Sequence, residues 1–151
     1  MNRTQRPESD AATGASGRRL VLPNRYSELA RVSEWLQDFA RESHLEHELA
    51  QGLEVAVNEA LTNIISYAYR DGARHDIIVD LFAQGDRISV DIEDDGVPFN
   101  PLEHDAGEPS PQSLEEARPG GRGILLMRNF THELRYVRRD GRNRLTLVLT
   151  F

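Results

Sequence analysis

The sequence predicts an α+β domain, a two-layer sandwich in which three helices cover one face of a mostly antiparallel mixed sheet of four or five strands. Apolar and polar residues alternate over 76–84 and 87–94, as in half-buried strands, and the Gly85-Asp86 turn between them favours a hairpin. Over residues 25–42 and 46–69 the apolar residues recur at helical spacing instead. The length of 151 residues suits a single domain.

The elements before the hairpin begin with a tail that we expect to be disordered. Residues 1–17 are small and polar and cannot bury enough apolar surface to become ordered, so the folded domain is expected to span residues 18–151. Residues 19–23 (RLVLP) predict a short strand that ends at a proline. The first helix, 25–42, carries apolar residues at Leu29, Val32, Trp35, Leu36 and Phe39. The second, 46–69, carries them at Leu53, Val57, Leu61, Ile64, Ile65 and Ala68.

A long polar loop follows the hairpin. Residues 97–119 are rich in Pro, Glu, Asp and Ser, and a loop of this length in a compact domain is in most cases either disordered or functional. A helix is predicted at about 122–131. The chain then ends in two strands, 132–139 and 143–151, around the turn Asp140-Gly141. These elements complete the predicted sandwich.

The composition excludes several classes of protein. All 18 basic residues are arginine and there is no cysteine. A Walker P-loop, a eukaryote-type protein kinase and a Schiff-base enzyme each need a lysine, so all three are excluded. Disulfides, thiol nucleophiles and thiolate metal sites are excluded as well. The formal net charge is −7 and the arginines are scattered along the sequence, which argues against direct nucleic-acid binding.

The sequence also carries no membrane signal. No stretch approaches the roughly 18–20 continuous apolar residues that span a bilayer. The N-terminus lacks the apolar region of a signal peptide. We therefore expect a cytoplasmic protein that makes no contact with a membrane.

The second predicted helix carries the most informative polar pair of the chain. Glu59 and Asn63 are four residues apart, so their side chains leave the same face of the helix. Asn63 stands where the helical period would place an apolar residue, and a polar group at the rim of a buried face is costly unless it binds something. Glu-x-x-x-Asn alone also fits a helix with polar neighbours, and both interpretations stay open at this point.

Two later segments combine glycines with polar or helical residues. Asp94 ends a predicted strand two residues before Gly96, so its carboxylate can face a pocket and accept a hydrogen bond from an amine such as N6 of adenine. A plain tight turn is the alternative. Gly120, Gly121 and Gly123 precede an apolar run, where the N–H groups of a helix start can hold phosphates, and a flexible hinge is the alternative. Together the three segments predict a nucleotide site.

These segments also carry a family resemblance. NEALTNIISYAY (58–69), DDGVPFNP (94–101) and GGRGILLM (120–127) resemble, in order and spacing, the N box and the two glycine boxes of the GHKL ATP-binding superfamily. The likeness is closest to its RsbW-like branch of anti-sigma-factor serine kinases, and HELRY at 132–136 adds to it. The resemblance covers residues 18–151 and implies the Bergerat (GHKL) fold with ATP and Mg²⁺ at the site.

The resemblance implies a role for each polar residue of the site. Asn63 would hold Mg²⁺, which bridges the phosphates, and Glu59 would be the general base that accepts the proton of an attacking hydroxyl. Phosphoryl transfer asks mainly for positioning and charge neutralisation, which such a site supplies. The remaining nucleotide-binding residues would be Asp94, Gly96, Gly121, Arg122 and Gly123.

Three further assignments come from the same resemblance. Arg118 or Arg122 would neutralise the γ-phosphate, and because Pro119 and an extra glycine intervene, the family pattern does not choose between them. Thr146, in the final strand, would lie near the adenine. Residues 100–119 would form the ATP lid.

Two functions from different classes follow from this resemblance. The first is an ATP-dependent serine/threonine kinase of a partner-switching module, which phosphorylates a STAS-domain anti-sigma factor antagonist and sequesters a sigma factor or another regulator. The second is a non-catalytic module whose ATP gates the capture of a partner. Glu59 favours the kinase, since a pure binder needs no base there. A histidine-kinase catalytic domain fits less well, because no phosphoacceptor helix precedes the domain. A homodimer is left open.

Overall fold

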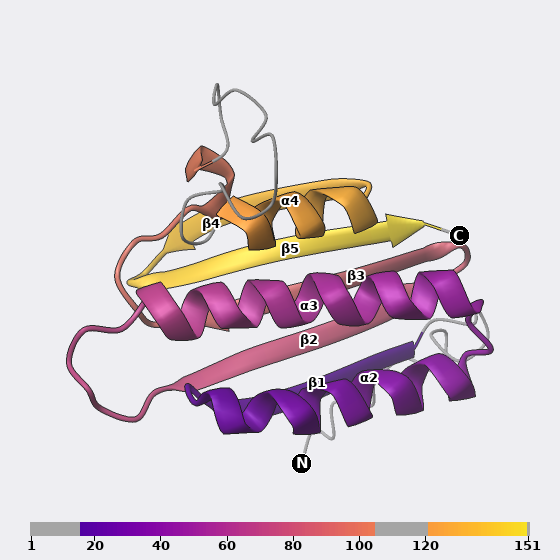
Figure 1. Cartoon of the computed structure of the whole chain (residues 1–151), viewed down its shortest axis with the longest axis horizontal. Helices are drawn as coiled ribbons and strands as arrows, with labels where there is room; N and C mark the ends of the chain where they lie inside the picture. The colour runs from indigo at the N-terminus through magenta and orange to yellow at the C-terminus, as the bar shows by residue number, and fades with distance from the viewer. Residues whose placement is uncertain (1–15, 105–120, 151) are drawn as a thin grey trace, which may run out of the picture.

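The computed structural model describes residues 16–104 and 121–150. Its elements follow in the order β1 (Ser16–Pro23), the short 3-10 helix η1 (Tyr26–Glu28), α2 (Leu29–Glu42), α3 (His47–Tyr67), β2 (Asp76–Gln84), β3 (Arg87–Asp94), the short 3-10 helix η2 (Pro101–His104), α4 (Gly121–Phe130), β4 (Glu133–Arg139) and β5 (Arg142–Thr150). In Figure 1, α2, α3 and α4 form one layer in front of the sheet. The predicted α+β sandwich is confirmed.

The sheet has five strands in the order β1-β2-β3-β5-β4, and every pairing among the described residues is antiparallel. The prediction of a mixed sheet is therefore wrong in this detail. Two helices, not one, connect β1 to β2, so β2 returns in the opposite direction. A parallel pair could form between β3 and β4, which α4 connects, but β5 inserts between them.

The hydrophobic core lies between the sheet and the helices. Along β2 and β3 every second residue is buried, as expected for strands with one covered face. Leu81 and Val90 from these strands are completely buried together with Leu53 and Leu61 of α3. Full burial of such a side chain contributes about 1.5–3 kcal/mol, so this layer contact is the main stabilising feature of the domain.

Several predicted boundaries shift by a few residues. β1 begins at Ser16, whereas the sequence predicted a strand only from residue 19 and placed residues 16 and 17 in the tail. The local composition predicts disorder here, but β1 pairs with β2, and this pairing begins with Ser16 opposite Ala83. The helix predicted from residue 25 starts as η1, and α3 ends at Tyr67. Of the predicted lid, 100–119, the described part holds η2, and residues 105–119 lie outside the described residues.

None of the helices in the described residues is both long and apolar enough to cross a bilayer.

Candidate nucleotide-binding site

Helices α3 and α4 bring Glu59, Asn63 and Gly123 together. A Cβ atom added at Gly123 would lie 2.7 Å from Oε2 of Glu59 and 3.6 Å from Nδ2 of Asn63. Glu59 is half-buried, whereas only 5% of Asn63 is exposed. The absence of a side chain at Gly123 therefore lets the start of α4 approach the polar face of α3. Gly123 lies 60 positions after Asn63 along the chain, and its grouping with Glu59 and Asn63 was predicted from the sequence pattern.

The side-chain amide of Asn63 is buried without a full set of partners. Its Nδ2 atom is inaccessible and makes no hydrogen bond with the described residues. A buried amide that lacks a partner is costly, because the hydrogen bonds it would make to water are lost. An amide in this state fits a side chain whose partner is a ligand.

Asp94 forms the second half of the site. This residue, only 2% exposed, ends β3 at the middle of the sheet. Its Oδ1 accepts hydrogen bonds from Gly96 N and from Asn143 Nδ2, both at 2.9 Å. Within the described residues no hydrogen bond reaches Oδ2, so this oxygen remains available to a ligand.

The surroundings of Asp94 act on its pKa in opposite directions. Burial is the largest influence and raises the pKa, since it disfavours the charged form. The hydrogen bonds from Asn143 and Gly96 oppose it, and the net result is a pKa above the ordinary value of 3.8. The nearby charge of Asp95 raises the pKa further, whereas Arg138 lowers it.

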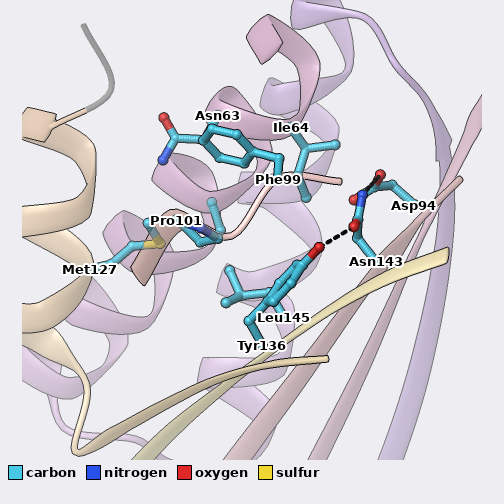
Figure 2. A pocket seen from close by; sticks show the side chains of 10 residues that line it. Asn63, Ile64, Asp94, Phe99, Pro101, Met127, Tyr136, Asn143 and Leu145 are labelled. Carbon is cyan, nitrogen blue, oxygen red and sulfur yellow. Dashed lines mark hydrogen bonds between the residues drawn. The ribbon is translucent and has the colours of Figure 1, made fainter. Parts of the chain in front are cut away.

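Asn143 connects Asp94 to the β4–β5 hairpin. Its amide nitrogen also donates to Val97 O at 2.8 Å. Its Oδ1 accepts hydrogen bonds from the Tyr136 hydroxyl and, at 2.9 Å, from Nη1 of Arg138. The hydrogen bonds from Tyr136 and between Asn143 and Asp94 are drawn in Figure 2. Asn143 therefore uses both amide hydrogens and the carbonyl oxygen, which fixes the orientation of the Asp94 carboxylate.

A small pocket lies between these polar groups. Asp94 and Asn143 line one side and Asn63 the other, as Figure 2 shows. The surface between them is mainly apolar and is lined by Ala60, Ile64, Phe99, Pro101, Met127, Tyr136 and Leu145. A mostly apolar pocket with a few converging polar groups is typical of small-molecule sites.

The assignment of Thr146 to this pocket is wrong. Side chains alternate along β5, so Asn143 and Leu145 face the pocket and Thr146 faces the opposite side of the sheet. There its hydroxyl donates to Oδ1 of Asp91 at 2.6 Å. Asn143 was not predicted as a site residue, although the same alternation, counted back from the apolar residues of β5, places its side chain inward.

A match to a known protein family identifies the domain. The sequence matches the family described as "Histidine kinase-like ATPase domain" over residues 22–149. The chain belongs to this family. Its sheet order and helical layer agree with that assignment, and the resemblance to the GHKL superfamily is confirmed.

Two relatives of this histidine kinase-like domain carry functional names. The chain is 38% identical over 114 residues to the serine/threonine-protein kinase BtrW of Bordetella bronchiseptica, covering 76% of this chain and 80% of the relative. It is 28% identical over 137 residues to the serine-protein kinase RsbW of Listeria monocytogenes, covering 87% and 83% of the two chains. These relatives are protein kinases of the RsbW-like branch.

A solved structure agrees on the fold alone. The crystal structure of the RsbU and RsbW domains of Rv1364c from Mycobacterium tuberculosis superimposes with a TM-score of 0.65 at 15% identity. The match covers 89% of this chain and 32% of that one. At this identity it supports the arrangement of helices and strands only.

Two more of the predicted residues of this ATPase-family site lie at the start of α4. Gly121 and Arg122 open this helix, as predicted for a phosphate-binding segment. Arg118 lies outside the described residues. The choice between Arg118 and Arg122 as the partner of the γ-phosphate stays a prediction.

Gly96 is required for close packing. A Cβ atom here would lie 2.3 Å from the carbonyl oxygen of Ala68, the residue that caps the end of α3. The same oxygen accepts a hydrogen bond from Val97 N at 2.8 Å. The backbone of Gly96 does not adopt a left-handed conformation, so the sharp turn suggested by the sequence is not the reason for the glycine. The reason is the contact between the Asp94 loop and the end of α3.

This contact predicts the effect of Gly96→Ala. The added methyl group meets backbone atoms, which cannot move aside as a flexible side chain can, so we expect the free energy of unfolding to fall by about 1–3 kcal/mol. Urea denaturation measures this change. Gly17→Ala is the matched control, because a Cβ there meets its nearest atom, in the Phe82 ring, at an ordinary 3.4 Å. A loss of stability that is the same in both variants would contradict the explanation.

His75 joins two loops next to the site. Its Nε2 lies 2.7 Å from Oδ2 of Asp71, and its Nδ1 lies 3.1 Å from Oδ1 of Asp95. The ring also stacks on Tyr69, with the centroids 4.6 Å apart. Asp71 belongs to the α3–β2 loop and Asp95 follows Asp94, so the histidine bridges these segments. The hydrogen bonds to Asp71 and Asp95 raise the pKa of His75 above its ordinary value of 6.5.

The bridge predicts a pH-dependent stability. Because the pKa is raised in the folded state, the stabilisation from His75 is complete below pH 6.5 and is lost as the pH rises through the raised pKa. His75→Gln should therefore lower the Tm at about pH 6 and have a much smaller effect at about pH 9. Thermal denaturation across this range tests it, with the exposed His47→Gln as control. A Tm difference for His75→Gln that does not vary with pH would exclude the bridge.

Proposed function

We propose that this protein is an ATP-dependent serine/threonine kinase of a partner-switching module. Its substrate is a STAS-domain anti-sigma factor antagonist, and its second partner is a sigma factor or another regulator that it sequesters. The names of BtrW and RsbW as protein kinases support the reaction class. The name "Anti-sigma F factor" of a relative from Oceanobacillus iheyensis, 31% identical over 78 residues, supports the regulatory class.

The position of Glu59 is the observation that carries this proposal. Its carboxylate oxygen reaches the start of α4, where the Cβ of any residue but glycine would nearly touch it. Helix starts bind phosphates through their free N–H groups and the helix dipole. A carboxylate held beside a bound phosphate chain is in the position of a general base for a hydroxyl that attacks the terminal phosphate. A module that only binds ATP does not need an acidic group there.

The other residues bind and orient the nucleotide. Asp94, held by Asn143, accepts a hydrogen bond from the adenine amine, while Gly121 and Gly123 leave backbone N–H groups open to the phosphates. Asn63 is the candidate Mg²⁺ ligand through its amide oxygen, while its buried Nδ2, which has no partner among the described residues, can donate to a phosphate oxygen. Magnesium in nucleotide sites is held by one or two protein oxygens together with phosphates, and it neutralises their charge.

Transfer of label tests the proposed reaction. The wild-type protein is incubated with γ-labelled ATP, Mg²⁺ and candidate STAS-domain proteins, and the label on serine or threonine is measured. We expect one of these proteins to be phosphorylated and the same protein with alanine at the accepting residue to stay unlabelled. If ATP binds and changes partner capture but no STAS-domain protein is labelled, the ATP-gated binding module replaces the kinase.

A further inference from the structure

The β4–β5 hairpin concentrates positive charge on an acidic protein. Residues 135–144 contain five arginines and one acidic residue, Asp140, in a chain whose formal net charge is −7. Five of the 18 arginines of the chain therefore gather in this one hairpin. Paired strands hold them on adjacent positions, with Arg139 opposite Arg142 and Val137 opposite Arg144.

Strand alternation separates the arginines by face. Tyr136 and Arg138 turn to the layer of the nucleotide pocket, where both contact Asn143. Val137 and Arg139 turn to the other face of the sheet, which no helix of the described chain covers. The nucleotide site thus uses one arginine of the hairpin and leaves the outer ones to a different role.

The outer arginines surround an exposed apolar residue. Arg139, Arg142 and Arg144 line a shallow hollow together with Val137 and two acidic residues, Glu93 and Asp140. Val137 is 52% exposed. Arg142 and Arg144 share one carboxylate, that of Glu93, at 3.7 and 2.6 Å. The guanidinium of Arg139 forms no ion pair or hydrogen bond with any described residue. Three guanidinium groups against the two carboxylates of Glu93 and Asp140 leave a net positive charge at this hollow.

We propose that this arginine hollow, formed by Val137, Arg139, Arg142 and Arg144, docks an acidic segment of a protein partner that carries an apolar side chain. Carboxylates of the partner pair with Arg139 and Arg142 in the two-pronged geometry that guanidinium groups favour. The apolar side chain covers Val137. The inference is independent of phosphoryl transfer, because it concerns the face of the sheet that lies away from Glu59.

The charge and shape of the surface favour protein over nucleic acid. A long nucleic acid extends beyond the hairpin and is repelled by the rest of a chain whose net charge is −7. A short acidic peptide segment contacts only the hairpin, where the local charge is positive. The centre of the hollow is Val137, whose side chain cannot form a hydrogen bond with a phosphate backbone. Contact with an apolar side chain would remove its surface from water, which is favourable. Charge complementarity with an apolar centre is typical of protein interfaces.

Fluorescence anisotropy with the full chain tests the docking surface. The probe is a labelled peptide of alternating glutamate and leucine, compared with the same peptide carrying lysine for glutamate and with oligothymidylate of equal length. We expect binding of the acidic peptide only, weakened by salt and reduced about tenfold by Arg139→Glu. Val137→Ser should also weaken it. The matched control is Arg41→Glu, the same charge change on an exposed residue of α2.

Each other outcome contradicts the proposal. No binding of the acidic peptide, or an equal loss in Arg41→Glu, leaves the hollow without a specific role. Binding of oligothymidylate that Arg139→Glu abolishes and Val137→Ser preserves assigns the surface to nucleic acid instead. Dimerisation of the wild type that Arg139→Glu prevents, measured by sedimentation, assigns it to a second copy of the chain. Circular dichroism verifies that the variants, all at exposed positions, are folded.

Discussion

Replacing Glu59 with glutamine is expected to reduce phosphoryl transfer to the protein substrate by about 10²–10⁴-fold, the usual contribution of a general base. Glutamine keeps the size of the side chain and its carbonyl oxygen, but it cannot take up the proton of the attacking hydroxyl. ATP affinity should change little, because Asp94, Asn63 and the glycines at α4 supply the binding contacts. Single-turnover transfer of labelled phosphate and calorimetric titration with ATP measure the two effects separately.

Glu54→Gln provides the control on the same helix. The Glu54 carboxylate lies one and a half turns earlier on α3 and accepts a hydrogen bond from Gln37 of α2 at 3.3 Å, away from the pocket. This variant should transfer phosphate at the wild-type rate. If Glu59→Gln also does so on a verified substrate, Glu59 is not the base. If Glu59→Gln loses ATP affinity in proportion to its rate, the residue serves binding.

The residues whose positions were predicted correctly share one property, which is that a local sequence pattern fixes where they lie. Glu59 and Asn63 lie four positions apart on a helix, and their common face follows from helix geometry alone. Asp94 and the glycines at the start of α4 belong to ordered motifs whose spacing fixes their place in the fold. The hairpin of β2 and β3 likewise has the predicted bounds, because alternation and a Gly-Asp turn specify it locally.

The features that the sequence did not reveal depend on contacts between distant segments. Thr146 was assigned to the pocket by position in a motif, but strand alternation turns it away and brings Asn143 in. Gly96 is required because it contacts Ala68 at the end of α3, about 28 residues earlier, and no local sequence pattern predicts this contact. The start of β1 at Ser16 depends on pairing with β2. Arg139, Arg142 and Arg144 come to share one face of the sheet only because β4 pairs with β5.

Replacing Asp94 with asparagine is expected to weaken ATP binding by about tenfold to a hundredfold, the range for loss of a hydrogen bond to a charged group. The change preserves the local structure, because the asparagine Oδ1 can still accept from Gly96 N and Asn143 Nδ2. At the position of Oδ2, however, an NH₂ group would face the NH₂ group of adenine, and two donors repel.

Because Asp94→Asn replaces an acceptor oxygen with a donor NH₂ group, the variant should bind a base with an acceptor at the same position better than the wild type does. Inosine triphosphate carries a carbonyl oxygen where adenine carries its amine, and an oxygen accepts from the new asparagine amide. Wild-type protein should therefore prefer ATP, and Asp94→Asn should shift the preference toward inosine triphosphate. Calorimetric titration of both proteins with both nucleotides gives the four affinities, and the Tm verifies the fold. A folded variant that keeps the wild-type affinity for ATP removes Asp94 from the adenine site. A uniform loss for both nucleotides instead means that Asp94 supports the pocket without contacting the base.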